Sequence, residues 1–277
     1  MIEFTGLTVG YRRKHPVLKN LNGNFAEHSV HGLLGANGVG KTTMLKAICG
    51  LLVPYAGTVS VDGRLSRRRL PSMLRELFLV PEEFDLPSVT LSAYAKMTSP
   101  LYPRFSQEAF IENCRAMEID ASVNLNAMSM GQRKKSYIAF ALACNTPYLI
   151  MDEPTNGLDI PAKSTLKRLL AAQAAAGTTI VISTHQVADL EKLVDSVTIM
   201  DNDGIILSAA TRDLEERLVF GPVPKDADCL YKEEMLAGLM GVCENTAGTE
   251  SSTDLTLLFN AAVRSRERLT EIMNRKK

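Results

Sequence analysis

The stretch of sequence that decides the fold runs from Val30 to Cys49 and reads VHGLLGANGVGKTTMLKAIC. Its first part, Val30 to Leu34, is an apolar run typical of a buried strand, and Lys41 to Cys49 reads as a helix. Between them, residues 35–42 match the pattern G-x-x-x-x-G-K-[ST]. Such a glycine-rich loop lets backbone N–H groups and a helix N-terminus surround a phosphate. The stretch therefore predicts a P-loop that binds a nucleoside triphosphate.

The spacing within this loop gives its side chains different tasks. Lys41 is expected to reach the β- and γ-phosphates, and the hydroxyl of Thr42 is expected to bind Mg²⁺. The predicted nucleotide-binding residues of the loop are Gly35, Ala36, Asn37, Gly38, Val39, Gly40, Lys41, Thr42 and Thr43.

A second candidate motif is a pair of carboxylates that follows an apolar strand, Tyr148 to Met151. Because successive side chains of a strand point to opposite faces, Asp152 and Glu153 cannot perform the same task. Asp152 suits the coordination shell of Mg²⁺. Glu153, at the tip of the strand, suits a base that orients or deprotonates an attacking water.

Strands and helices alternate along much of the chain, which predicts an α/β fold with a mainly parallel sheet and helices on both faces. Short strands near the N-terminus predict an antiparallel β edge subdomain, and residues 86–145 predict an inserted α-helical subdomain. The predicted strands are Ile2–Val9, Leu21–Phe25, Val30–Leu34, Thr58–Val61, Leu77–Val80, Tyr148–Met151, Ile180–Ser183 and Val197–Met200; the clearest helices are Gln107–Met117 and Gln132–Ala143. After Leu218, residues 221–224 read as a linker, and one helix is expected over Leu255–Met273.

Composition excludes several classes of protein. The chain has 277 residues, of which 45% are hydrophobic and 22% charged, as in an ordinary globular protein. The net charge is zero, so no nucleic-acid partner is expected. The five cysteines are scattered and form no CxxC pair, which argues against a disulfide framework or a zinc site and fits a reducing cytosol. Glu3 and the absence of an apolar run near it give no sign of a secretory signal, and no membrane-spanning segment is expected.

Three further motifs narrow the class of nucleotide-binding protein. Residues 128–132, which read MSMGQ, open a helix with Ser129 as its N-cap. Gly157-Leu158-Asp159 follows the carboxylates, and Ser183-Thr184-His185 ends the next strand. In the order and spacing of these motifs, from Tyr11 to about Leu218, the sequence resembles the ATP-binding cassette (ABC) ATPases.

The resemblance implies a role for each matching residue. Tyr11 falls where an aromatic ring stacks on adenine, and Val17 where an apolar side chain contacts the same base. His185 falls where a histidine contacts the γ-phosphate and the catalytic water. The remaining matches are the signature, which meets the nucleotide of the opposite protomer, and the acid of the D-loop: Ser129, Met130, Gly131, Gln132 and Asp159.

Two positions depart from the family pattern. In the signature, Met128 and Met130 stand where leucine and glycine are usual, while Ser129 and Gly131 remain, so a working signature is expected. In the Q-loop, Glu82 stands where the family has a glutamine. An ionised glutamate accepts hydrogen bonds but donates none, so ligation of Mg²⁺ by Glu82 is expected to survive while coupling to a partner is put in doubt.

The resemblance implies an ATPase subunit that dimerises, as a homodimer or with another cassette, around two Mg²⁺-ATP and drives transport through separate membrane subunits. It implies ATP and Mg²⁺ as cofactors and a position on the cytoplasmic face of the membrane. Within the family, the sequence most resembles the separately encoded ATPase subunits of bacterial exporters. The expected domains are an ABC ATPase domain over residues 1–218 and a small C-terminal extension over residues 219–277. Two alternatives stay open: a soluble ABC ATPase that acts on ribosomes or DNA, and a regulatory cassette with little hydrolysis.

Overall fold

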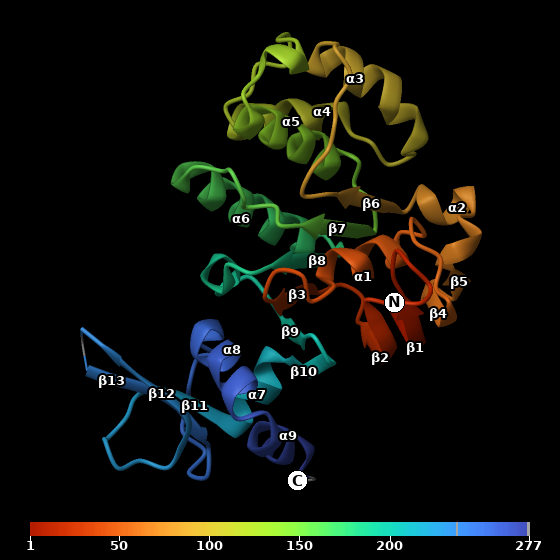
Figure 1. Ribbon diagram of the computed structural model, residues 1–277. Helices are drawn as coiled ribbons and strands as arrows, with labels where there is room; N and C mark the ends of the chain where they lie inside the picture. Colours follow the sequence, from red (N-terminus) through yellow and green to blue (C-terminus); the bar gives the residue numbers. More distant parts are fainter. Residues whose placement is uncertain (237, 276–277) are drawn as a thin grey trace. The chain divides into compact units, whose positions relative to one another are not determined.

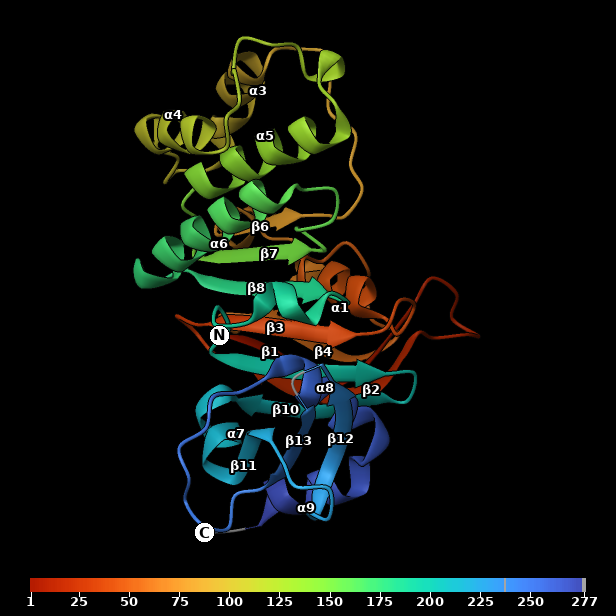
Figure 2. The same ribbon diagram turned by 90° about the vertical axis from the view of Figure 1, so that its left-hand side faces the viewer.

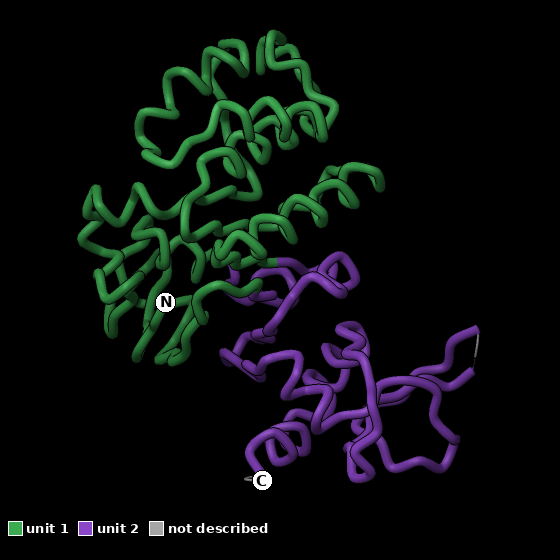
Figure 3. The backbone as a smooth tube through the Cα atoms, turned by 180° about the vertical axis from the view of Figure 1, so that it is seen from behind, with its two compact units in different colours: residues 1–30, 42–183 green, residues 31–41, 184–277 purple. Residues whose placement is uncertain are grey.

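The computed structural model describes residues 1–236 and 238–275. Within these residues the chain forms two compact units, shown in different colours in Figure 3. The first unit comprises residues 1–30 and 42–183, and the second comprises residues 31–41 and 184–277.

The N-terminal part of the first unit is an antiparallel sheet with the strand order β2-β1-β4-β5. Its strands are β1 (Ile2–Val9), β2 (Leu18–Phe25), β4 (Ala56–Val61) and β5 (Arg64–Leu65). Gly57 has a positive φ of 73°, and a Cβ there would lie 2.2 Å from the carbonyl oxygen of Gly6. Glycine is therefore required where β1 and β4 approach closely. The predicted antiparallel edge is confirmed.

The parallel strands of this unit lie side by side in the order β8-β7-β6, as Figure 2 shows. They are β6 (Leu77–Val80), β7 (Tyr148–Asp152) and β8 (Thr179–Thr184). Every residue of β7 and β8 is buried, as expected for parallel strands that are covered on both faces. Because Asp152 pairs with Ser183 in this register, the carboxyl ends of β7 and β8 bring polar side chains together.

The helices of the first unit begin with α1, which directly follows the P-loop. Polar side chains cap four of them: Thr90, Ser106, Ser129 and Asp159 each accept a hydrogen bond from a backbone N–H of the first helical turn. The helices are α1 (Lys41–Ile48), α2 (Pro71–Leu74), α3 (Leu91–Thr98), α4 (Gln107–Ala116), α5 (Met130–Ala143) and α6 (Ile160–Ala175), with 3₁₀ turns at Ser66–Arg68, Ser99–Leu101 and Leu125–Ala127.

Helices α3, α4 and α5 lie together as the inserted helical subdomain (Figure 1). An aromatic core holds them, in which the ring of Phe140 on α5 contacts Tyr94 on α3 and Phe110 on α4 at centroid distances of 5.2 and 6.5 Å. The predicted helical insertion is confirmed.

The second unit contains β3 (Val30–Gly35), which runs parallel to β9 (Ser196–Asp201). A hairpin then adds β10 (Gly204–Ala210) antiparallel to β9. A 3₁₀ turn, Val187–Leu190, precedes β9. Leu190 packs near Gly32 of β3, where a Cβ would lie 3.2 Å from the leucine side chain.

The C-terminal part of the second unit differs from the sequence-based expectation. Instead of a linker followed by one helix, it has a three-stranded antiparallel sheet in the order β11-β13-β12. The expected long helix is two helices, since Ser265 has a non-helical φ of −131° and its hydroxyl donates to the carbonyl of Leu230. The elements are α7 (Thr211–Arg217), β11 (Leu218–Pro222), β12 (Cys229–Met235), β13 (Gly238–Glu244), α8 (Leu255–Arg264) and α9 (Arg266–Asn274).

Two cysteines that lie apart in sequence meet in this C-terminal sheet. Cys229 on β12 and Cys243 on β13 face each other in the strand register and form a disulfide. Their scattered spacing argued against disulfide bonding, and that expectation is wrong for this pair because the hairpin brings them together. Cys49, Cys114 and Cys144 are buried thiols. Within the described ranges, none of the helices combines the length and apolar character needed to span a bilayer.

Candidate nucleotide site

The P-loop is curled by two glycines with positive φ, Gly38 at 87° and Gly40 at 106°. Other residues rarely adopt this backbone. The ammonium of Lys41 donates to the carbonyl oxygens of Gly35 at 2.8 Å and Ala36 at 3.2 Å. The side chain of Lys41 therefore reaches from the C-terminal end of the loop back to its start.

Asp152 is buried at the carboxyl end of β7. Its Oδ1 accepts a hydrogen bond from the hydroxyl of Ser183 on β8. Carboxylate and hydroxyl oxygens are the donors that Mg²⁺ prefers, so Asp152 and the half-buried Thr42 fit the proposed metal by their chemistry. Ser183 was not predicted as a site residue; two hydroxyl residues, Ser183 and Thr184, at the C-terminal end of a buried strand are the signal that could have found it.

Glu153 occupies an unusual backbone position. Its φ is +46°, in the left-handed region that a residue with a side chain seldom adopts. Its N–H donates to the carbonyl of Ser183 at 3.0 Å, and its own carbonyl accepts from the N–H of Asn156 at 3.2 Å. The surrounding structure thus holds Glu153 in a strained turn directly after β7, as is common at functional sites.

The signature residues lie at the start of α5. The hydroxyl of Ser129 accepts from the N–H of Gln132, and Gln132 Oε1 accepts from the N–H of Ser129 at 2.9 Å, which completes a capping box. Met130 is 73% exposed. Gly131 faces the D-loop closely, since a Cβ there would lie 3.0 Å from the carbonyl of Gly157. The capped turn presents this segment to solvent.

Asp159 of the D-loop is the N-cap of α6 and accepts from the N–H of Ala162 at 2.8 Å. That hydrogen bond, together with the nearby ammonium of Lys135 at 3.4 Å, lowers the pKa of the Asp159 carboxyl below its usual value. The contact links the D-loop to the helix that carries the signature.

The predicted base-contacting residues lie in the first unit and His185 lies in the second. Tyr11 is 59% exposed, and the ammonium of Lys46 lies 5.6 Å from its ring centroid. Val17 is half-buried and its N–H donates to the carbonyl of Val9. His185 is exposed directly after β8.

Glu82 is exposed after β6, and its Oε1 accepts a hydrogen bond from the side-chain amide of Asn156 at 3.1 Å. The Q-loop position is therefore joined to the turn that carries Glu153. Glu82, Arg133, Lys134 and Asn156 lie on the wall of a cavity of about 600 Å³.

Replacing Glu82 by glutamine should change how strongly ATP binding depends on Mg²⁺. With the metal removed by EDTA, the charge of Glu82 opposes a nearby triphosphate, so Glu82→Gln should bind metal-free ATP up to about fivefold more tightly, as one exposed charge interaction permits. Binding of Mg²⁺-ATP should change little. Paired titrations with Mg²⁺ and with EDTA measure the ratio, with Glu83→Gln as the control. An equal ratio in wild type and Glu82→Gln would mean that Glu82 points away from the nucleotide.

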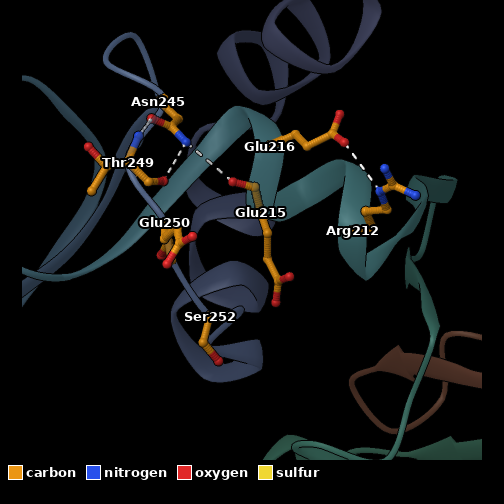
Figure 4. Close-up of a pocket in the computed structure, with 9 residues that line it drawn as sticks. Arg212, Glu215, Glu216, Asn245, Thr249, Glu250 and Ser252 are labelled. Carbon is orange, nitrogen blue, oxygen red and sulfur yellow. Dashed lines mark hydrogen bonds and ion pairs between the residues drawn. The ribbon is translucent and has the colours of Figure 1, made fainter.

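A separate cavity of about 760 Å³ lies in the second unit between α7 and the segment that follows β13 (Figure 4). Asn245 on its wall is bonded within the fold: its side-chain oxygen accepts from the N–H of Thr249, and its amide donates to the carbonyls of Thr249 and Glu215. Arg212 pairs with Glu216 one helical turn later. These contacts stabilise the segment after β13, and none of the predicted nucleotide-site residues lines this cavity.

A P-loop sequence and, later in the chain, a buried acid pair at the end of a strand are typical of P-loop nucleoside triphosphatases. The model of the ABC transporter family matches residues 18–156. A curated relative, the methionine import ATP-binding protein MetN of Carboxydothermus hydrogenoformans, is 30% identical over 233 residues, which is 77% of this chain and 67% of the relative.

Solved structures share the same fold. One ATP-binding subunit of an ABC transporter is 27% identical and has a TM-score of 0.71, with 78% of this chain and 92% of that chain covered. The dimeric cassette MJ0796, in a post-hydrolysis state with ADP and Pi, is 24% identical with a TM-score of 0.68, over 76% of this chain and 98% of that chain. The chain belongs to the ABC transporter family. It is the ATP-binding and ATP-hydrolysing subunit of such a transporter.

Proposed function

We propose that two cassettes enclose two Mg²⁺-ATP, each nucleotide lying between the P-loop of one protomer and the signature of the other. The observation that carries this proposal is the exposed, capped signature at the start of α5, with Ser129 and Gln132 fixed by their reciprocal hydrogen bonds. A rigid segment at the surface suits recognition of a nucleotide held by another chain. The MJ0796 cassette, which has the same fold, is dimeric with ADP and Pi bound, and this supports a dimer.

Within each site, Lys41 neutralises the β- and γ-phosphates, and Tyr11 and Val17 contact the base. Thr42 and Asp152, with Glu82, would hold Mg²⁺, which supplies charge neutralisation to the phosphates when it is bound. Glu153 accepts a proton from the attacking water, and His185 orients the γ-phosphate and that water. Asp159 connects the D-loop to the signature helix through Lys135.

We infer that this ATPase acts from the cytoplasmic face of the membrane through separate membrane subunits. The family and the similarity to import and transport subunits support this inference. Residues 1–218 would form the ATPase domain, and residues 219–277 would form a C-terminal extension. A role on ribosomes or DNA has no comparable support, since the chain carries no net charge.

The shared site is tested by mixing two inactive variants. Ser129→Arg disrupts the signature and Lys41→Ala disrupts the P-loop. A dimer made of one variant alone therefore has two damaged sites. A mixed dimer has one site in which an intact P-loop meets an intact signature. We expect mixing to restore hydrolysis to about half of the wild-type rate per mixed dimer, measured as phosphate release.

The controls are each variant alone and a mixture of two differently tagged Lys41→Ala chains. Co-purification through the two tags verifies that mixed dimers form. Mixed dimers that form and yet release no more phosphate than the pure variants would overturn the shared site.

A further inference from the structure

Lys134 is a lysine in an unusual place, because its side chain is only 4% exposed. Lysines are rarely buried unless a polar or charged group compensates them. Lys134 lies on α5, two residues after Gln132 of the signature, and its ammonium donates to the backbone carbonyl of Glu153 at 2.6 Å. This is a short charge-assisted hydrogen bond. It joins the signature helix to the residue that we assign as the base.

The carbonyl that Lys134 contacts belongs to the strained turn described above. The Glu153 peptide is held from both sides, by the carbonyl of Ser183 and by the N–H of Asn156 together with Lys134. Because φ of Glu153 is +46°, this backbone persists only while its neighbours enforce it. The direction of the Glu153 side chain follows from this backbone, so losing one of these contacts would change where the carboxylate points.

Burial lowers the pKa of the Lys134 ammonium below its usual value, and the charges of Glu82, Glu153 and Asp152 oppose that shift in part. Glu82 and Lys134 line the same cavity. Glu82 at the Q-loop position and Lys134 on α5 are thus neighbours of opposite charge. The acid at position 82, where the family has glutamine, is therefore matched by a buried cation.

We propose that Lys134 is a positioning residue for hydrolysis. Its hydrogen bond from the signature helix α5 holds the backbone of Glu153 in the left-handed conformation and so sets the direction of the Glu153 carboxylate. The proposal rests on the proposed role of Glu153 as the base. Its consequence is that a shift of α5 moves the Glu153 turn, so the signature and the base change position together.

The test compares Lys134→Met with Lys134→Arg and with Arg133→Gln, a matched charge loss one residue earlier on α5. Lys134→Met keeps the unbranched apolar stem and removes the donor. We expect its kcat to fall about 10- to 100-fold, the cost of a small misplacement of a catalytic group, with the KM for ATP within about twofold of wild type. Lys134→Arg should recover part of kcat, and Arg133→Gln should stay near wild type. Thermal melting and binding of a fluorescent ATP analogue verify folding.

A double variant separates this proposal from the role of Glu153. In a Glu153→Gln background, Lys134→Met should reduce the residual rate by less than about twofold, because residues that act as a unit are not additive. If Glu153→Gln is inactive while folded Lys134→Met hydrolyses ATP at the wild-type rate, the positioning role is wrong and the base assignment stands. If Glu153→Gln itself keeps full activity, the base assignment fails first. If Lys134→Met and Arg133→Gln lose kcat equally, the loss of a positive charge in this region explains the effect, and the proposal is overturned.

Discussion

Glu153→Gln is expected to bind ATP and to lose hydrolysis. The amide has nearly the shape of the carboxylate but accepts no proton, and a general base contributes a factor of about 10² to 10⁴. Glu153 lies in a turn that is pinned by Ser183, Asn156 and Lys134, and this turn should persist because all three bonds involve its backbone. The variant should therefore keep its fold and accumulate an ATP-bound dimer, which gel filtration with ATP and a phosphate-release assay would detect.

A suitable control is Glu83→Gln, which changes the same residue type on an exposed part of the Q-loop. It should hydrolyse ATP at nearly the wild-type rate and should elute as wild type does. Wild-type turnover by Glu153→Gln would remove Glu153 from the catalytic role, whatever the state of the dimer.

The parts of the fold that the sequence predicts well are those with local signals. The strand before the P-loop, the helix after it and the all-apolar run of β7 are each visible in a few adjacent residues. Their predicted bounds agree with β3, α1 and β7 to within one residue. The same holds for the capped start of α5, where Ser129 and Gln132 have the spacing of a capping box.

The C-terminal sheet could not be predicted because its signal depends on contacts between strands. β12 carries Lys232, Glu233 and Glu234 in succession, which breaks the alternation expected of a half-buried strand. Gly241 in β13 weakens the strand pattern further, yet a Cβ there would lie 2.9 Å from the carbonyl of Tyr231. The glycine is needed by the neighbouring strand, and that neighbour is not visible in the sequence.

Contacts between segments that are distant in sequence also limited the prediction of the candidate site. Arg133, Lys134 and Lys135 read as a basic run at the start of a helix, where cations disfavour the helix dipole. In the structure Lys134 is buried against Glu153 and Lys135 pairs with Asp159. Lys134 and Lys135 thus each have a partner in the segment between β7 and α6, a carbonyl for the first and a carboxylate for the second. Only the packing of α5 on that turn reveals these partners.

Lys41→Ala is expected to impair nucleotide binding, the step before the hydrolysis that Glu153→Gln blocks. Lys41 is 5% exposed and its ammonium is already held across the loop by the carbonyls of Gly35 and Ala36. It therefore meets the phosphates without first losing much side-chain entropy. A hydrogen bond to a charged group contributes about 1.5–3 kcal/mol, so affinity for Mg²⁺-ATP should fall about 10- to 100-fold. Titration with a fluorescent ATP analogue measures this loss.

Two comparisons make the result specific to the P-loop. Lys19→Ala removes an exposed lysine from β2 and should leave the affinity unchanged. AMP lacks the β- and γ-phosphates that Lys41 is expected to contact, so its weak binding should be nearly the same in Lys41→Ala and wild type. A loss of affinity for AMP as large as that for ATP would indicate a collapsed loop rather than a missing phosphate contact. Equal affinity of Lys41→Ala and wild type for ATP would contradict the P-loop assignment, because the one cation of the loop would then have no part in binding the nucleotide.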